Sequence, residues 1–329
     1  MSSSPASDAV TLIEMGPRDG LQNEPAAAQL PTATKLELVQ RLATCGLTEI
    51  ETTAFVSPQW VPAMADHAGL TRAVSAAWAG RPGAPRFWVL TPNLRGFEAA
   101  VAAGARHVAV FAAASESFSQ RNINCSIAES MARFAPVLER AAAQGVDVRG
   151  YVSCVAGCPY DGAVAPAQVA AVARDLHQMG CCEVSLGDTI GVGTPRSILA
   201  MLDAVAREVP PALLAGHYHD TWGMAVANVY ASWQFGLRRF DSAVAGLGGC
   251  PYAKGASGNV ATEDLVWLFQ GLGVETGVDL ARLADTGAWI SHQIGRAPAS
   301  RAAQALRGQA PAQQAATSAH ASIRKPADF

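Results

Sequence analysis

Short apolar runs, many of them rich in β-branched residues, alternate along this chain with Ala-rich segments whose apolar residues recur with a helical period. Eight runs have the length and pattern of buried strands, at residues 10–15, 47–53, 86–90, 107–111, 147–152, 183–186, 213–219 and 240–244. Helices are predicted between them, at 33–45, 94–103, 126–143, 166–179, 195–209 and 224–235. This alternation indicates βα units and a parallel sheet.

Eight βα units in succession favour one α/β domain, a (β/α)8 TIM barrel, over a doubly wound sheet. A dinucleotide-binding sheet should carry Gly-x-Gly-x-x-Gly after its first strand, and the Gly-Pro-Arg-Asp-Gly at 16–20 does not match. Two further helical patterns, at 263–272 and 280–295, predict extra C-terminal helices. We therefore expect a barrel domain over 8–296. Residues 297–329, rich in Ala, Gln, Ser and Pro without an apolar period, should form a mobile tail.

The composition excludes several classes of protein. The chain has 329 residues, of which 50% are hydrophobic and 16% charged, so it can bury a large core. Its net charge of −3 gives no electrostatic reason to bind nucleic acid. No apolar run is long enough for a membrane span, and the first residues lack the pattern of a secretory signal. Seven cysteines without regular spacing indicate free thiols. We expect a cytoplasmic protein that forms a homodimer or a higher homo-oligomer.

Polar residues gather where the predicted strands end. Because the carboxyl ends of barrel strands meet at one face, these side chains should lie close together there. Burying them without a ligand would be costly, because unpaired charges lose their solvation. The residues concerned are Arg18 and Asp19 after the first strand, Glu51 in the second, Asp188 at the end of the sixth, and His217 and His219 in the seventh.

The two histidines suggest a metal site. Side chains alternate along a strand, so His217 and His219 point to the same side. With the Asp19 carboxylate and the amide oxygen of Asn259 they form a mixed nitrogen and oxygen set, typical of Mg²⁺, Mn²⁺ or another divalent ion. Each residue alone has an ordinary alternative: surface histidines, a turn-forming Asp19, a loop residue at Asn259. Their joint placement at strand ends favours the metal.

Cys250 lies in a loop with glycines at 246, 248, 249, 255 and 258. Such a loop is flexible enough to close over a pocket, and a thiol carried by it could transfer a proton. The alternative is an exposed cysteine without a function.

Several segments together resemble 3-hydroxy-3-methylglutaryl-CoA lyase, a family of metal-dependent TIM-barrel enzymes; they are 13–24, 55–58, 150–154, 185–191 and 245–253. A wider group of acyl lyases and synthases shares Arg-Asp-Gly after strand one and His-x-His in strand seven. Leu-Gln-Asn-Glu at 21–24 and the cysteine loop point to the lyase branch. The resemblance implies cleavage of an acyl-CoA, 3-hydroxy-3-methylglutaryl-CoA, to acetyl-CoA and acetoacetate, in leucine degradation and ketone-body formation.

The resemblance also implies a role for each residue at a matching position. Asp19, His217, His219 and Asn259 would hold Mg²⁺ or Mn²⁺, Arg18 would contact the reacting carbonyl, and Cys250 would transfer a proton with Glu51 or Asp188 assisting.

Three alternatives stay open. The first is a lyase of the same mechanism that acts on another 3-hydroxy-3-substituted acyl-CoA, because the motifs describe the metal and not the pocket wall. The second is a synthase that condenses acetyl-CoA with a 2-oxo acid. The third is a non-catalytic protein that uses the metal as a structural clip, although such sites are usually closed and rich in thiolates.

Overall fold

Eight short strands close into one parallel barrel in sequence order, and β8 pairs with β1 to complete it. The structure is a computed structural model that describes residues 9–249 and 258–308. The strands are β1 Thr11–Glu14, β2 Glu49–Ala54, β3 Arg86–Leu90, β4 His107–Ala113, β5 Asp147–Ser153, β6 Glu183–Asp188, β7 Leu214–Tyr218 and β8 Arg239–Ser242. The predicted TIM barrel is confirmed, with each strand within a few residues of its expected place.

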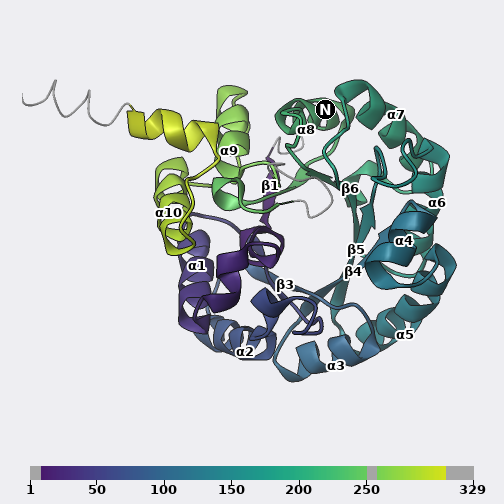
Figure 1. The fold of residues 1–329 in the computed structure, drawn as a ribbon, viewed down its shortest axis with the longest axis horizontal. Coiled ribbons are helices and arrows are strands. Elements are labelled where there is room, and N and C mark those ends of the chain that lie inside the picture. The colour runs from purple at the N-terminus through teal and green to yellow at the C-terminus, as the bar shows by residue number, and fades with distance from the viewer. Residues whose placement is uncertain (1–8, 250–257, 309–329) are drawn as a thin grey trace, which may run out of the picture.

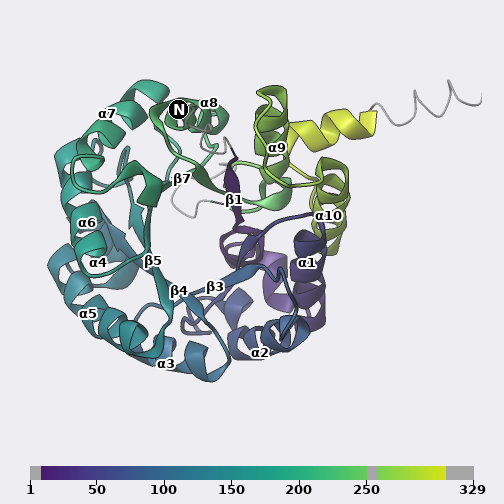
Figure 2. The same cartoon turned by 180° about the vertical axis from the view of Figure 1, so that it is seen from behind.

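A ring of helices surrounds the barrel (Figure 1), and the view from behind shows the same ring (Figure 2). Its members are α1 Thr32–Thr44, α2 His67–Trp78, α3 Leu94–Ala102, α4 Glu116–Ile123, α5 Ile127–Gln144, α6 Pro166–Gln178, α7 Pro195–Val205 and α8 Ala225–Phe235. The extra helices α9 Thr262–Gly271 and α10 Leu280–Gln293 pack beside α8 and α1. Among the described helices none is both long and apolar enough to cross a bilayer.

Strand β5 shows how the sequence pattern sets the two sides of the barrel wall. Val148 and Val152 are buried and point outward, toward the helices α5 and α6 that pack on this strand. The intervening Arg149 and Tyr151 point into the barrel, where the Arg149 Nη1 donates to the Tyr151 hydroxyl over 2.8 Å. The barrel interior is therefore partly ionic, and its charges are paired across strands.

The start of the expected tail is ordered, which corrects that prediction for its first part. Residues 301–308 form a helix. Asp264 holds its start, because the Asp264 Oδ1 accepts from the Ala302 amide over 2.8 Å and from the Ser300 hydroxyl over 2.7 Å. A carboxylate there also stabilises the helix dipole. Only Ala303 of this helix is fully buried, so the segment has no apolar period to reveal it. Residues 309–329 lie outside the described residues.

Candidate active site and metal centre

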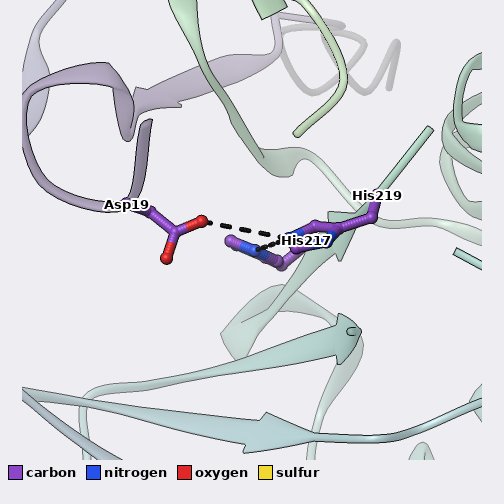
Figure 3. A group of neighbouring side chains, drawn as sticks. All are labelled: Asp19, His217 and His219. Atoms are coloured by element: carbon purple, nitrogen blue, oxygen red, sulfur yellow. Dashed lines mark hydrogen bonds and ion pairs between the residues drawn. The ribbon is translucent and has the colours of Figure 1, made fainter. Parts of the chain in front are cut away.

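Asp19, His217 and His219 converge at the carboxyl end of the barrel (Figure 3). Asp19 belongs to a single π-turn, Gly16–Gly20, that follows β1 and is closed by a hydrogen bond from the Gly20 amide to the Met15 carbonyl. His217 is in β7 and His219 lies just beyond it. One ligand atom from each residue lies within 4.8 Å of the others. The two Nε2 atoms are 3.3 Å apart, and that of His219 is 3.9 Å from the Asp19 Oδ2.

Asp241 in β8 fixes the orientation of His217. Its Oδ2 lies 3.0 Å from the His217 Nδ1 and accepts from the Ser185 hydroxyl over 2.7 Å, while its Oδ1 accepts from Arg149 over 2.5 Å. Burial opposes the charge of Asp241, but Arg149 and His217 outweigh it and lower the pKa to about 2. The ionised carboxylate needs a proton donor, so His217 carries its proton on Nδ1 and turns the lone pair of Nε2 toward Asp19 and His219.

The protonation states suit a divalent cation. Burial, followed by the neighbouring His217, lowers the pKa of His219 to about 4, so this imidazole is neutral near pH 7. Burial alone would raise the pKa of Asp19, but Arg18 and both histidines together hold it well below its usual range. One carboxylate and two imidazoles, with room for other ligands, are the donors that an open divalent-metal site needs. The residues present therefore fit a divalent cation.

Asn259 lies beside this group and turns its side-chain nitrogen toward Asp19. Its Nδ2 donates to the Asp19 Oδ2 over 2.8 Å and to the Leu247 carbonyl over 3.2 Å. The backbone brings it there through an antiparallel bridge to His219. The residue before it is Gly258. A side chain would not fit at this position, because a Cβ there would lie only 2.4 Å from the backbone of Gly248. In this arrangement the Asn259 amide orients Asp19, and its role as a metal ligand stays a prediction.

Arg18 and Glu51 form a buried pair beside the metal residues. The Arg18 Nε donates to the Glu51 Oε1 over 2.7 Å, and its Nη1 to the Asp19 Oδ1 over 2.5 Å. The Tyr151 hydroxyl donates to the other oxygen of Glu51. Because both oxygens accept hydrogen bonds and Glu51 is fully buried, this carboxylate positions Arg18, and its part in proton transfer stays a prediction.

Asp188 makes its contacts with the loop that follows β6. It ends β6, but its carboxylate accepts from the backbone amides of Val192 over 3.2 Å and Gly193 over 2.8 Å. Burial raises its pKa to about 6 against the lowering effect of those amides. The neighbouring Gly187 and Thr189 line the cavity above the metal residues, which is described below, whereas Asp188 does not. Asp188 thus holds the loop after β6. Cys250 lies outside the described residues, and its role in proton transfer stays a prediction.

The metal residues and Arg18 form the polar floor of one cavity of about 370 Å³, which we call the main cavity. Its wall is largely apolar, with contributions from Val56, Leu90 and Phe111. Trp60, at the same cavity, is 85% exposed, which marks the open mouth. The site can therefore hold a ligand with an anionic or chelating end at the floor and an apolar part along the wall.

Comparison with known proteins gives consistent matches. The model of the HMGL-like family matches residues 9–290. A 3-hydroxy-3-isohexenylglutaryl-CoA/hydroxy-methylglutaryl-CoA lyase of Pseudomonas aeruginosa is 58% identical over 301 residues, which are 92% of this chain and 98% of that protein.

A mitochondrial hydroxymethylglutaryl-CoA lyase of Bos taurus is 55% identical over 90% of this chain and 89% of its own. The crystal structure of a hydroxymethylglutaryl-CoA lyase from Pseudomonas aeruginosa superposes with a TM-score of 0.87 at 57% identity, covering 92% of this chain and 99% of that one. With a family model and relatives that span nine-tenths of its length, the chain belongs to the HMGL-like family.

Proposed function

We propose that this protein is a carbon–carbon lyase that cleaves 3-hydroxy-3-methylglutaryl-CoA to acetyl-CoA and acetoacetate, as in leucine degradation and ketone-body formation. The observation that carries the proposal is the convergence of Asp19, His217 and His219 beside Arg18 on one cavity. The relatives described above are lyases that act on this acyl-CoA by name, which disfavours a synthase.

The reaction breaks the bond between C2 and C3 of the acyl group. The C3 hydroxyl loses its proton and becomes the ketone of acetoacetate, while C2 takes the electron pair and then a proton to give acetyl-CoA. A divalent ion held by Asp19, His217 and His219 would make that hydroxyl more acidic and orient it.

Arg18 supplies the charge that the leaving fragment needs. Negative charge develops on the thioester oxygen as the bond breaks, and a fixed guanidinium in a site with little water stabilises it. Glu51 and Asp19 hold Arg18 by two hydrogen bonds, so little reorganisation is required at the moment of reaction. Because Glu51 and Asp188 are both occupied by other groups, we assign the proton transfer to Cys250.

The first test is a cleavage assay with 3-hydroxy-3-methylglutaryl-CoA, with Mg²⁺ or Mn²⁺ and with EDTA. We expect turnover only with the metal. Circular dichroism of the EDTA-treated protein should show an intact fold, because the barrel does not depend on the metal residues. Unfolding by EDTA would support the structural-clip alternative, and absence of cleavage with either metal would contradict the proposal.

The role of Cys250 can be tested by Cys250→Ser, which keeps the size of the side chain but raises the pKa of the proton donor. We expect turnover to fall by roughly 10²–10⁴, the range for general acid–base catalysis, with metal affinity unchanged. Turnover near that of the wild type would exclude Cys250 from proton transfer.

The cytoplasmic location and the homo-oligomeric state follow from the sequence alone and stay predictions. Cell fractionation and the mass of the protein in solution test them.

A further inference from the structure

Another cavity, of about 220 Å³, lies on the helix side of the barrel wall, and we call it the outer cavity. It lies beside α2, a helix that neighbours α3 in the ring (Figure 1). Its principal lining residues are Thr71, Val74 and Trp78 of α2, Phe87 and Val89 of β3, and Ala105 after α3.

The outer cavity is separate from the main cavity. Phe87 and Val89 lie on the outer side of β3, because side chains alternate along a strand. Trp88 between them points into the barrel, where its indole donates to the Glu49 carboxylate over 2.9 Å. The two cavities share no lining residue. A molecule in the outer cavity would therefore not touch the metal residues.

The hydroxyl of Thr71 is a buried polar group without a partner. Thr71 lines the outer cavity and is 4% exposed, and its Oγ1 makes no hydrogen bond within the part of the chain that the structure describes. Such groups destabilise a native state and are rare. The other two hydroxyls of the lining are engaged. Ser75 donates to the Gly104 carbonyl over 3.2 Å. Thr52 donates to the Trp88 carbonyl over 3.3 Å.

The rest of the inner lining is apolar. Val74, Val89 and Ala105 are buried, and the rings of Trp78 and Phe87 contact each other with centroids 4.8 Å apart. An ordered water needs about two to four polar partners, and this lining offers it little besides the Thr71 hydroxyl. An apolar molecule with one oxygen atom suits the lining better, because it satisfies the hydroxyl and fills the remaining space.

The charged side chain of the lining is at the outer edge. Arg106 lines the cavity but is exposed. Burial lowers the pKa of the half-buried His107, although Asp147, whose Oδ2 is 3.1 Å from the His107 Nδ1, opposes this effect. The imidazole is therefore neutral near pH 7. A charged group placed beside Thr71 would lose its solvation without gaining a counter-charge, so the inner end of a ligand should be neutral.

We propose that the outer cavity binds a small neutral molecule, with an apolar body about the size of one aromatic ring and one hydroxyl or carbonyl oxygen. The oxygen pairs with the Thr71 hydroxyl, and the body packs on Val74, Val89 and Ala105. This inference does not rest on the proposed function, because none of these residues belongs to the main cavity. p-Cresol is a probe of this class, and toluene has the same body without the oxygen.

The first test is calorimetric titration of the protein with each probe. We expect p-cresol to bind with a Kd on the order of 1 mM or below, the range for a ligand of this size. Thr71→Val keeps the shape of the side chain without the hydroxyl, and should lower the preference for p-cresol over toluene by roughly three- to tenfold. Thr52→Val makes the same change at an engaged hydroxyl and should alter that preference less.

A second variant locates the probes in the outer cavity. Val74→Phe narrows the cavity and should weaken the binding of both probes by at least tenfold. Ala99→Phe adds the same ring at an exposed position of α3 outside the lining, and binding should not change. If Val74→Phe does not fold, Thr71→Val still decides the question.

Two results would overturn the inference. One is the absence of p-cresol binding at about 10 mM, well above the expected Kd. The other is binding of p-cresol whose preference over toluene is the same in Thr71→Val as in the wild type, because the oxygen would then lie away from the Thr71 hydroxyl.

Discussion

The two ends of the barrel contain the same kinds of charged side chain and use them differently. At the amino end, five strands begin with a charged residue: Glu49, Arg86, Asp147, Glu183 and Arg239. The buried carboxylates of Glu49 and Glu183 are both paired with arginines; Glu49 accepts from Arg86 over 2.5 Å and from Arg239 over 2.7 Å. At the carboxyl end, the lone pairs of His217 and His219 face a cavity with Asp19.

The difference shows that buried charge alone does not mark an active site. A charge is available for chemistry when its protein partners leave a direction open, as Asp19 and the histidines do toward the main cavity. Arg149 links the two ends, since it donates to Glu183 at 2.5 Å on one side and to Asp241 at 2.5 Å on the other. The paired amino end thereby supports the residue that orients His217.

Removing the charge nearest the reacting atoms should have the largest effect. Arg18→Gln keeps a polar side chain but not the cation, and we expect kcat to fall by roughly 10²–10³, the loss associated with a preorganised donor at a developing oxyanion. Metal titration should stay close to that of the wild type. Arg86→Gln makes the same change at the amino end and should leave kcat unaltered. An effect of Arg18→Gln on KM alone would contradict the role.

The link between the ends can be tested at Asp241. Asp241→Asn removes the carboxylate that holds the Nδ1 proton of His217, and metal affinity should fall by roughly 10–100-fold, as for other groups that orient a metal ligand. Calorimetric titration with Mn²⁺ measures the affinity, and ¹⁵N NMR reports the tautomer of His217. Ser185→Ala removes only the second hydrogen bond of the same oxygen and should have a smaller effect. Unchanged affinity with a shifted thermal midpoint would reduce Asp241 to a structural partner of Arg149.

The sequence predicts where several residues of this site lie. The features that it does not predict were out of reach for physical reasons. Strand ends place Arg18, Asp19, His217 and His219 correctly, because the side-chain period and the barrel face leave few arrangements. Asp241 was missed, although an aspartate inside a buried strand is a visible signal, because its partner Arg149 lies far away in the sequence. The directions in which Asn259 and Glu51 point depend on hydrogen bonds with distant segments, which no local pattern encodes. The direction of Asp188 depends on how the loop after β6 folds back, which presents the amides of Val192 and Gly193 to it.

A change confined to the amino end should affect stability and not chemistry. Glu49→Gln weakens the hydrogen bonds of Arg86, Arg239 and the Trp88 indole, and we expect a loss of roughly 1–3 kcal/mol in the free energy of unfolding. Urea unfolding measures it. Glu98→Gln, exposed on α3, is the control and should change little. A marked drop in metal affinity in Glu49→Gln would show that the two ends are coupled more tightly than the single link through Arg149 implies.

Two buried carboxyls, Glu14 at the end of β1 and Glu263 in α9, belong neither to the ion pairs of the amino end nor to the metal residues. They should produce the smallest effect, a dependence of stability on pH. Burial raises the pKa of Glu263 to about 8, with the charge of Glu14 adding to it. Burial also raises the pKa of Glu14 to about 7. The hydrogen bonds that Glu14 accepts from Thr262, Val244 and Gly16 lower this pKa but do not outweigh burial. A folded pKa above the unfolded value means that the native state binds the proton more tightly. This stability is complete below about pH 4.5 and is lost as the pH rises through 7 and 8.

Glu263→Gln removes the titration while its side-chain oxygen can still accept from the Ala245 amide, as the Glu263 oxygens do over 2.9 Å. With EDTA present to exclude metal binding, the free energy of unfolding of the wild type should fall between pH 7 and pH 8, and that fall should be smaller by about 1 kcal/mol in the variant. Glu275→Gln, at an exposed position, should keep the slope of the wild type. A wild-type stability that rises over this interval would mean that both carboxyls are already ionised at pH 7, so that the amide hydrogen bonds outweigh burial.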